Sequence, residues 1–308
     1  MAINTAKING LTWLNVTNAG KKEIDFLAKN FSFHPLDLED SYASHYAQRP
    51  KINEHRDYLF FILLFPYYDR KKREIMSAEI DFFITPTHLI TVHNEELAVL
   101  DNFFNSAKAD IQGKEKFTGA TSSQLLYEIL NRLLLGCFPM LDHLIIDVNN
   151  IQRKIFTGFE RQMVREILVI KRNIISFRNT MQEHKKMIRK IMTNNSHFFP
   201  QSELTLYYHD LIDHTKNIWD ILETQKETIS ALEETNNAIV GFRLNTIMKT
   251  LTVFFVIAFP LTFFATIFGM NAVHMPIVGQ PYDFWIILGI MAMASLVVTL
   301  FFKKKNWL

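Results

Sequence analysis

The stretch LTVFFVIAFPLTFFATIFGM at residues 251–270 decides the architecture of this 308-residue chain, because it contains no charged side chain. A helix of this length rises about 30 Å, which matches the hydrocarbon core of a bilayer. A second uncharged stretch, FWIILGIMAMASLVVTLFF, follows at residues 284–302. Buried core helices are the alternative, but they rarely run this long without a polar face. We therefore predict a membrane domain over residues 246–308, with spans at about 250–270 and 284–302.

The charges around the two spans predict their orientation. Arg243 and Lys249 precede the first span and three lysines at 303–305 follow the second, whereas residues 271–283 contain no lysine or arginine. Cytoplasmic flanks carry the excess of positive charge, so both chain ends should lie in the cytoplasm and the short loop outside. The N-terminus lacks the pattern of a cleaved signal peptide. We expect a multi-pass protein of the cell membrane.

Composition excludes several functions for the remainder of the chain. The hydrophobic fraction of 48% and the net charge of +2 argue against a disordered chain and against an obligate nucleic-acid binder. Cys137 is the only cysteine, which excludes an internal disulfide and thiolate metal sites and favours a reducing compartment. The sequence contains no Walker-type glycine loop, catalytic nucleophile or metal triad in a suitable context. We do not expect an enzyme.

The N-terminal hundred or so residues alternate strand-like and helix-like segments. Aromatic and β-branched residues predict strands in 11–16, 58–68 and 79–93. Between them, residues 21–31 and 35–42 are typical of short helices. These segments predict an N-terminal α/β domain.

Strand signals disappear after about residue 121, and apolar residues then recur at helical spacing, with a kink expected at Pro139. The many cations of residues 161–192 are most simply a solvated helix face. A heptad-like apolar pattern with no proline before Pro260 predicts one helix from about 204 to 267, which would extend about 95 Å. The predicted fold class is α+β: a cytoplasmic domain over residues 1–245 whose long stalk helix continues into the membrane.

The first span ends in Gly269-Met270-Asn271 at the predicted outer membrane face, and a short loop, a last span and a lysine-rich tail follow. This arrangement resembles the CorA family of magnesium channels, whose hallmark is this tripeptide. Further segments extend the resemblance over essentially the whole chain: FHPL at 33–36, LED at 38–40, QRPK at 48–51, DYLF at 57–60, DLIDHT at 210–215 and RLNTIMKTLT at 243–252.

The resemblance implies a funnel-shaped homopentamer in which the long helices line one axial pore and the second spans form an outer ring. It implies that Gly269, Met270 and Asn271 form the selectivity filter at the pore mouth. It also implies passive influx of Mg²⁺ driven by the membrane potential and gated by intracellular Mg²⁺. The expected partners are identical subunits, membrane lipid and divalent cations.

The resemblance further implies which side chains line the pore. The implied positions are Met248, Leu251, Phe259 and Thr262, and the spacing agrees independently because positions 248, 251, 255, 259 and 262 share one helix face. Phe255 therefore joins the candidate pore-lining set.

Asp210 and Asp213 are candidate ligands for a regulatory magnesium ion. With His209 and His214 they form a dense cluster, in which Asp210 and His214 share a helix face, as do His209 and Asp213. Such a cluster alone is usually a solvated surface. The resemblance, however, implies that Asp210 binds Mg²⁺ between subunits, together with an acidic residue of the neighbouring N-terminal domain.

One departure from the family pattern leaves the ion preference open. The family commonly has Met-Pro followed by an acidic residue, whereas here Met275-Pro276 is followed by Ile277, and Asp283 is the only acid of the loop. A transporter of zinc, cobalt or nickel on the same scaffold is therefore an alternative. A membrane-tethered coiled-coil scaffold without transport is the other, although it does not explain the uncharged face ending in the tripeptide.

Overall fold

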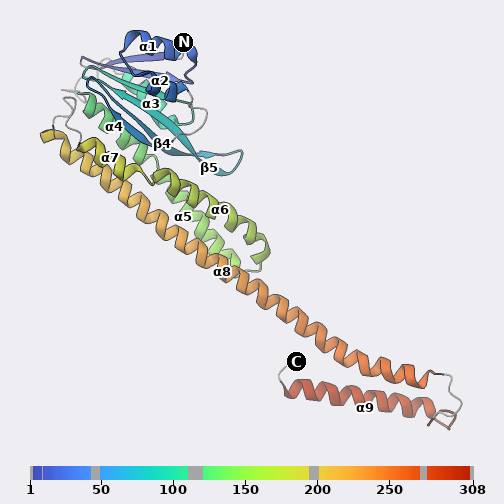
Figure 1. Cartoon of the computed structure of the whole chain (residues 1–308). Helices are drawn as coiled ribbons and strands as arrows, with labels where there is room; N and C mark the ends of the chain where they lie inside the picture. Colours follow the sequence, from blue (N-terminus) through green and yellow to red (C-terminus); the bar gives the residue numbers. More distant parts are fainter. Residues whose placement is uncertain are drawn as a thin grey trace. The chain divides into compact units, whose positions relative to one another are not determined.

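The computed structural model describes residues 3–8, 10–42, 49–109, 121–193, 201–270 and 276–305, with the side chains of the 201–270 stretch described from residue 205. The chain divides into two compact units, Met1–Glu233 and Glu234–Leu308. Figure 1 labels helices and strands of the chain along its sequence. The division falls inside the long helix predicted from the sequence.

The first unit is built on a six-stranded mixed sheet with the strand order β1-β2-β6-β5-β4-β3. Only the neighbours β2 and β6 are parallel, and the other neighbouring strands are antiparallel. The strands are β1 (Ile3–Ile8), β2 (Leu11–Thr17), β3 (Lys51–Glu54), β4 (Leu59–Asp69), β5 (Glu74–Ile84) and β6 (His88–His93).

The predicted segment at 79–93 contributes to two strands, because a tight turn interrupts it. The backbone N–H of Thr85 donates to the carbonyl of His88 at 2.9 Å, and the N–H of His88 donates to Thr85 Oγ1 at 2.8 Å. Pro86 lies inside this turn, where its missing N–H removes no ladder hydrogen bond. The strands predicted at 11–16 and 58–68 are confirmed as β2 and β4. Strands β1 and β3 were not predicted from the sequence.

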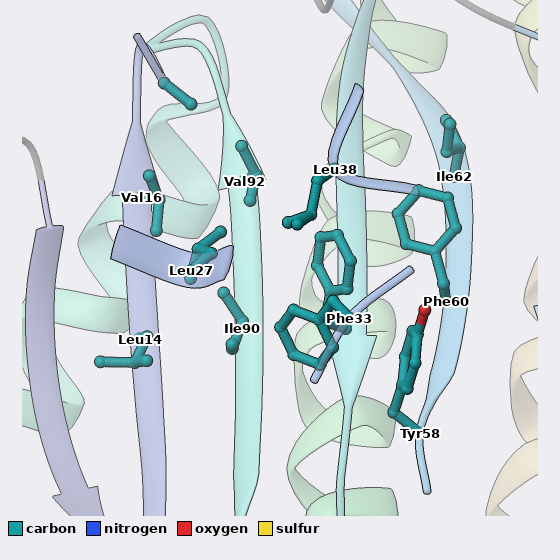
Figure 2. Packing of buried hydrophobic residues seen from close by; sticks show 12 residues of the cluster. Leu14, Val16, Leu27, Phe33, Leu38, Tyr58, Phe60, Ile62, Ile90 and Val92 are labelled. Carbon is teal, nitrogen blue, oxygen red and sulfur yellow. The ribbon is translucent and has the colours of Figure 1, made fainter. Parts of the chain in front are cut away.

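Helices α1 (Lys21–Asn30) and α2 (Pro35–Tyr42), both predicted from the sequence, cover one face of the sheet. Their apolar side chains and those of the sheet form one buried cluster (Figure 2). In this cluster the ring of Phe33 stacks on that of Phe83 and makes a tilted contact with that of Tyr58. Residues of this cluster labelled in the figure are Leu14, Val16, Leu27, Phe33, Leu38, Tyr58, Phe60, Ile62, Ile90 and Val92. Burial of such aromatic and aliphatic side chains is the main stabilisation of the sheet.

The opposite face of the sheet is covered by α3 (Ala98–Ala109), α4 (Ser122–Leu135) and α6 (Glu160–Met181), and α7 (His184–Met192) contacts it through His184 on Phe65. Trp13 contacts Phe103 and Phe104 with ring centroids 5.3 and 5.0 Å apart. Residues Ser122–Ile155 are long and apolar enough to span a membrane, but much of their apolar surface is buried inside this unit. Their buried apolar side chains therefore belong to the core of this unit.

Pro139 marks a helix start and not the kink that we expected. Helix α4 ends at Leu135, and α5 (Phe138–Ile155) has Pro139 in its first turn, where the missing N–H has no helical partner to lose. The cations of residues 161–192 are likewise not all solvated. Lys171 and Arg178 of α6 pair with Glu233 and Glu223 at 2.5 Å each.

Helix α8 (Gln201–Phe268) has 68 residues and confirms the long helix predicted from about 204 to 267. Leu211, Ile218, Leu222 and Ile229 are completely buried in the first unit, as the heptad spacing predicts. Helix α9 (Asp283–Lys304) has no buried residue. The helical segments Thr205–Phe268 and Asp283–Lys304 are long and apolar enough to cross a membrane.

Burial of a histidine beneath the sheet predicts a pH-dependent stability. His184 is 1% exposed and contacts Phe65 edge-on, and this burial lowers the pKa of His184 to about 4. The unfolded chain would bind a proton at this residue below about pH 6.5, whereas the folded chain would not. The free energy of unfolding should therefore fall by about 3 kcal/mol on account of His184 as the pH is lowered from 6.5 to 4.

Denaturant unfolding of the wild type and a His184→Leu variant at several pH values checks this expectation. The difference in stability between the two should change by about 1.4 kcal/mol per pH unit across that window. The exposed His209→Gln variant serves as the control and should track the wild type. Parallel curves for His184→Leu and the wild type would contradict the assignment.

Candidate functional site

The five candidate pore-lining side chains form one stripe along α8 within the second unit. At 100° per residue their positions fall within about 80° of arc. All five are exposed, and Phe259 retains 71% of its surface. The stripe comprises Met248, Leu251, Phe255, Phe259 and Thr262. A single helix cannot enclose a pathway, so the stripe requires a partner or lipid to cover it.

Threonine hydroxyls along α8 bond to the helix itself. Thr262 Oγ1 donates to the carbonyl of Ala258 at 2.8 Å, and Thr266 Oγ1 donates to that of Thr262 at 2.7 Å. Such bonds satisfy the hydroxyl proton in an apolar environment. They also leave the oxygen lone pairs as acceptors, so Thr262 presents an acceptor on an otherwise apolar stripe.

The helix continues through Pro260 and ends at Phe268, where the tripeptide begins. The N–H of Gly269 donates to the carbonyl of Ala265 at 3.0 Å, and the N–H of Met270 donates to that of Ile267 at 3.3 Å. A Cβ on Gly269 would lie 3.0 Å from that Ala265 oxygen, so glycine suits this close approach. Asn271 and His274 lie outside the described residues.

Asp283, the only acid between the spans, is engaged by the backbone at the start of α9. Its carboxylate accepts hydrogen bonds from the N–H of Gly279 at 3.0 Å and from its neighbour Phe284 at 2.7 Å. A carboxylate at a helix N-terminus is also stabilised by the helix dipole. Asp283 therefore has a structural role in this loop.

Asp210 and Asp213 both lie exposed on the part of α8 that belongs to the first unit. Asp210 Oδ2 is 3.4 Å from His214 Nε2, the i,i+4 pair expected from the spacing. It also accepts a hydrogen bond at 3.4 Å from the hydroxyl of Tyr127 on α4, which lies 83 residues earlier in the chain. Burial, followed by the charge of Asp210, raises the pKa of Tyr127.

Tyr127 is the neighbour that sequence reasoning missed, because no local pattern links α4 to α8. Within the described residues, no group of three or more histidine, cysteine, aspartate or glutamate side chains could hold a metal ion. The structure of one chain therefore brings Asp210, His214 and Tyr127 together but supplies no complete metal site.

Known transport proteins are similar in sequence to this chain over nearly its whole length. The chain is 26% identical over 299 residues to the "Cobalt/magnesium transport protein CorA" of Thermotoga maritima, covering 96% of this chain and 83% of that protein. It is 22% identical over 317 residues to the "Magnesium transport protein CorA" of Haemophilus influenzae, covering 98% and 93%.

Among solved structures, the complete CorA magnesium transporter of Methanocaldococcus jannaschii has the same fold, with a TM-score of 0.83 and 19% identity. The alignment covers 97% of this chain and 92% of that one. The family model for CorA-like Mg²⁺ transporter proteins matches residues 9–304. This chain therefore belongs to the CorA-like Mg²⁺ transporter family.

Proposed function

We propose that this protein is a homopentameric magnesium channel that admits Mg²⁺ passively, with the spans and termini oriented as the flanking charges predict. The main support for this proposal is the exposed stripe on α8, which leads to the helix end where Gly269-Met270-Asn271 begins. Five copies of this stripe around an axis would enclose a path and cover the exposed side chains. Lipid would cover the outward faces of α8 and α9.

Magnesium surrenders its water reluctantly, so a selective mouth would recognise the hydrated ion through its water shell. Five Asn271 side chains would offer amide oxygens to those waters, and the lone pairs of Thr262 would extend the same chemistry along the stripe. Neutral acceptors favour release of the ion as well as binding. Rings of Met248 and Leu251 would be apolar and would gate by dewetting.

No energy source besides the membrane potential is needed. Moving a divalent ion through about 100 mV contributes about 4.6 kcal/mol, twice the value for one elementary charge. Uptake should therefore increase steeply as the interior becomes more negative.

Proteoliposomes containing the purified protein and an enclosed magnesium indicator test the proposal. Imposing an inside-negative potential should start Mg²⁺ uptake, and competing Zn²⁺, Co²⁺ or Ni²⁺ should reveal the ion preference. Transport of one of these metals without magnesium would replace the substrate on the same scaffold. Failure of every cation to move would favour the non-transporting scaffold.

We also propose that Asp210, with Asp213 nearby, binds intracellular Mg²⁺ between neighbouring subunits and so stabilises the closed channel. Three features support the proposal: Asp210 is exposed, His214 and Tyr127 flank it, and one chain by itself lacks a complete ligand set among the described residues. An ion that binds only the closed assembly shifts the population toward it.

Asp210→Asn should reduce the protection that Mg²⁺ gives against trypsin, because a neutral amide attracts the cation less than a carboxylate does. The Mg²⁺ concentration for half-maximal protection should rise at least about tenfold, which corresponds to about 1.4 kcal/mol. Asp220→Asn, an exposed acid on the same helix, is the matched control. Unchanged protection in Asp210→Asn would remove Asp210 from the regulatory site.

A further inference from the structure

The turn between α5 and α6 exposes two aromatic side chains that the proposed ion path does not use. Helix α5 ends at Ile155 and α6 begins at Glu160. In the turn between them, Phe156 is 67% exposed and Phe159 is 48% exposed. Gly158 has a φ of +97°, which lets the chain reverse in so few residues. Two neighbouring phenylalanines at a surface turn indicate a contact site.

Positive charge surrounds this aromatic turn. Residues 149–165 contain four cations, all of them exposed: Arg153, Lys154, Arg161 and Arg165. The only acid in that range, Glu160, is 3% exposed. Glu166, the next residue after Arg165, is paired with Arg73 at 2.9 Å. The turn therefore presents two exposed apolar rings among four exposed positive charges.

Two ion pairs between α6 and α8 locate the turn within the first unit, because they show that the two helices run antiparallel. Arg178 pairs with Glu223, and Lys171, further toward the start of α6, pairs with Glu233, further along α8. Glu233 is the last residue of the first unit. The turn that precedes α6 therefore lies toward the end of this unit from which α8 leaves it.

We propose that the α5–α6 turn docks on anionic lipid at the cytoplasmic membrane surface, with Phe156 and Phe159 entering the headgroup region and the four cations binding lipid phosphates. Aromatic rings favour the interface, and basic residues are attracted to anionic headgroups. A second copy of this turn would be repelled by like charge. Because the family resides in membranes, a lipid surface is always available to the chain.

The contact is tested on the full chain in nanodiscs with an environment-sensitive dye on a Thr157→Cys variant. The single native cysteine, Cys137, is buried and should not label. Lipids carrying a quencher in the headgroup region should quench the dye at 157 at least about twofold when phosphatidylglycerol is present, and far less in phosphatidylcholine alone. A Lys29→Cys label at the end of α1 is the exposed control and should not respond.

Two variants separate the apolar and ionic parts of the contact. Phe156→Ser with Phe159→Ser, or glutamine at all four cations, should each remove most of the quenching while thermal unfolding of the first unit is unchanged. Equal quenching in neutral and anionic nanodiscs, or none above the Lys29 control, would overturn the proposal. Mg²⁺ uptake measured on the same preparations reports the channel separately, so either claim can fail alone.

Discussion

Asn271→Ala should abolish most Mg²⁺ uptake in proteoliposomes. The substitution removes every amide acceptor that we place at the pore mouth, five at once in a pentamer. A hydrogen bond to a charged partner contributes about 1.5–3 kcal/mol, so flux should fall at least about 100-fold even if only part of that binding is lost. Indicator fluorescence under an inside-negative potential measures the loss.

Gln280→Ala provides the matched control, since it removes an exposed amide from the same loop outside the tripeptide. Uptake by this variant should stay within about twofold of the wild type, because Gln280 contributes nothing to the proposed filter. Wild-type flux and ion preference in Asn271→Ala would refute the proposed filter. Equal losses in both variants would indicate general damage to the loop.

Asp37→Ala should produce the largest loss of stability among single substitutions in the first unit that we consider. Asp37 is 1% exposed at the start of α2, and its carboxylate accepts hydrogen bonds from Asn53, His55 and Tyr58 at 2.7, 2.8 and 2.7 Å. Truncation would leave these groups without their acceptor and separate α2 from β3 and β4. We expect a loss of about 4 kcal/mol, which lowers the midpoint of thermal unfolding by about 10 °C.

Thermal unfolding followed by tryptophan emission measures the effect, because Trp13 lies in the core of the same unit. Tyr58→Phe removes one of the three donors and also the acceptor of the His34 N–H, and it should cost less than Asp37→Ala because Asn53 and His55 keep their acceptor. Asp25→Ala, an exposed acid on α1, should leave the midpoint nearly unchanged. A midpoint for Asp37→Ala close to that of Asp25→Ala would show that this carboxylate does not hold α2 in place.

The helical predictions succeeded where a signal was local and long. The helix predicted from about 204 to 267 is α8, because apolar spacing and the lack of proline before Pro260 act within a few turns. Pro139 shows the limit of the same reasoning. A proline that ends a helix, kinks it or begins the next one looks alike in sequence, and here packing made it the first turn of α5.

The candidate site also has parts that could be predicted from the sequence and parts that could not. The family resemblance implied four positions of the stripe on α8 and their role, whereas helical spacing agreed with these positions and added Phe255. The contact between Tyr127 and Asp210 joins segments 83 residues apart, so no local pattern could predict it. The exposure of Phe156 and Phe159 could not be predicted from the sequence either, because an aromatic residue is more often buried than exposed.

The amino-acid sequence by itself determined the two apolar helices and the unbroken α8, because the length of an uncharged run and the 3.6-residue period are properties of neighbouring residues. Only the tertiary structure decided that the helical, apolar Ser122–Ile155 packs its apolar face into the core and that Asp37 joins α2 to the sheet. Burial and long-range hydrogen bonds depend on which surfaces meet in space, and that information is distributed over the whole first unit.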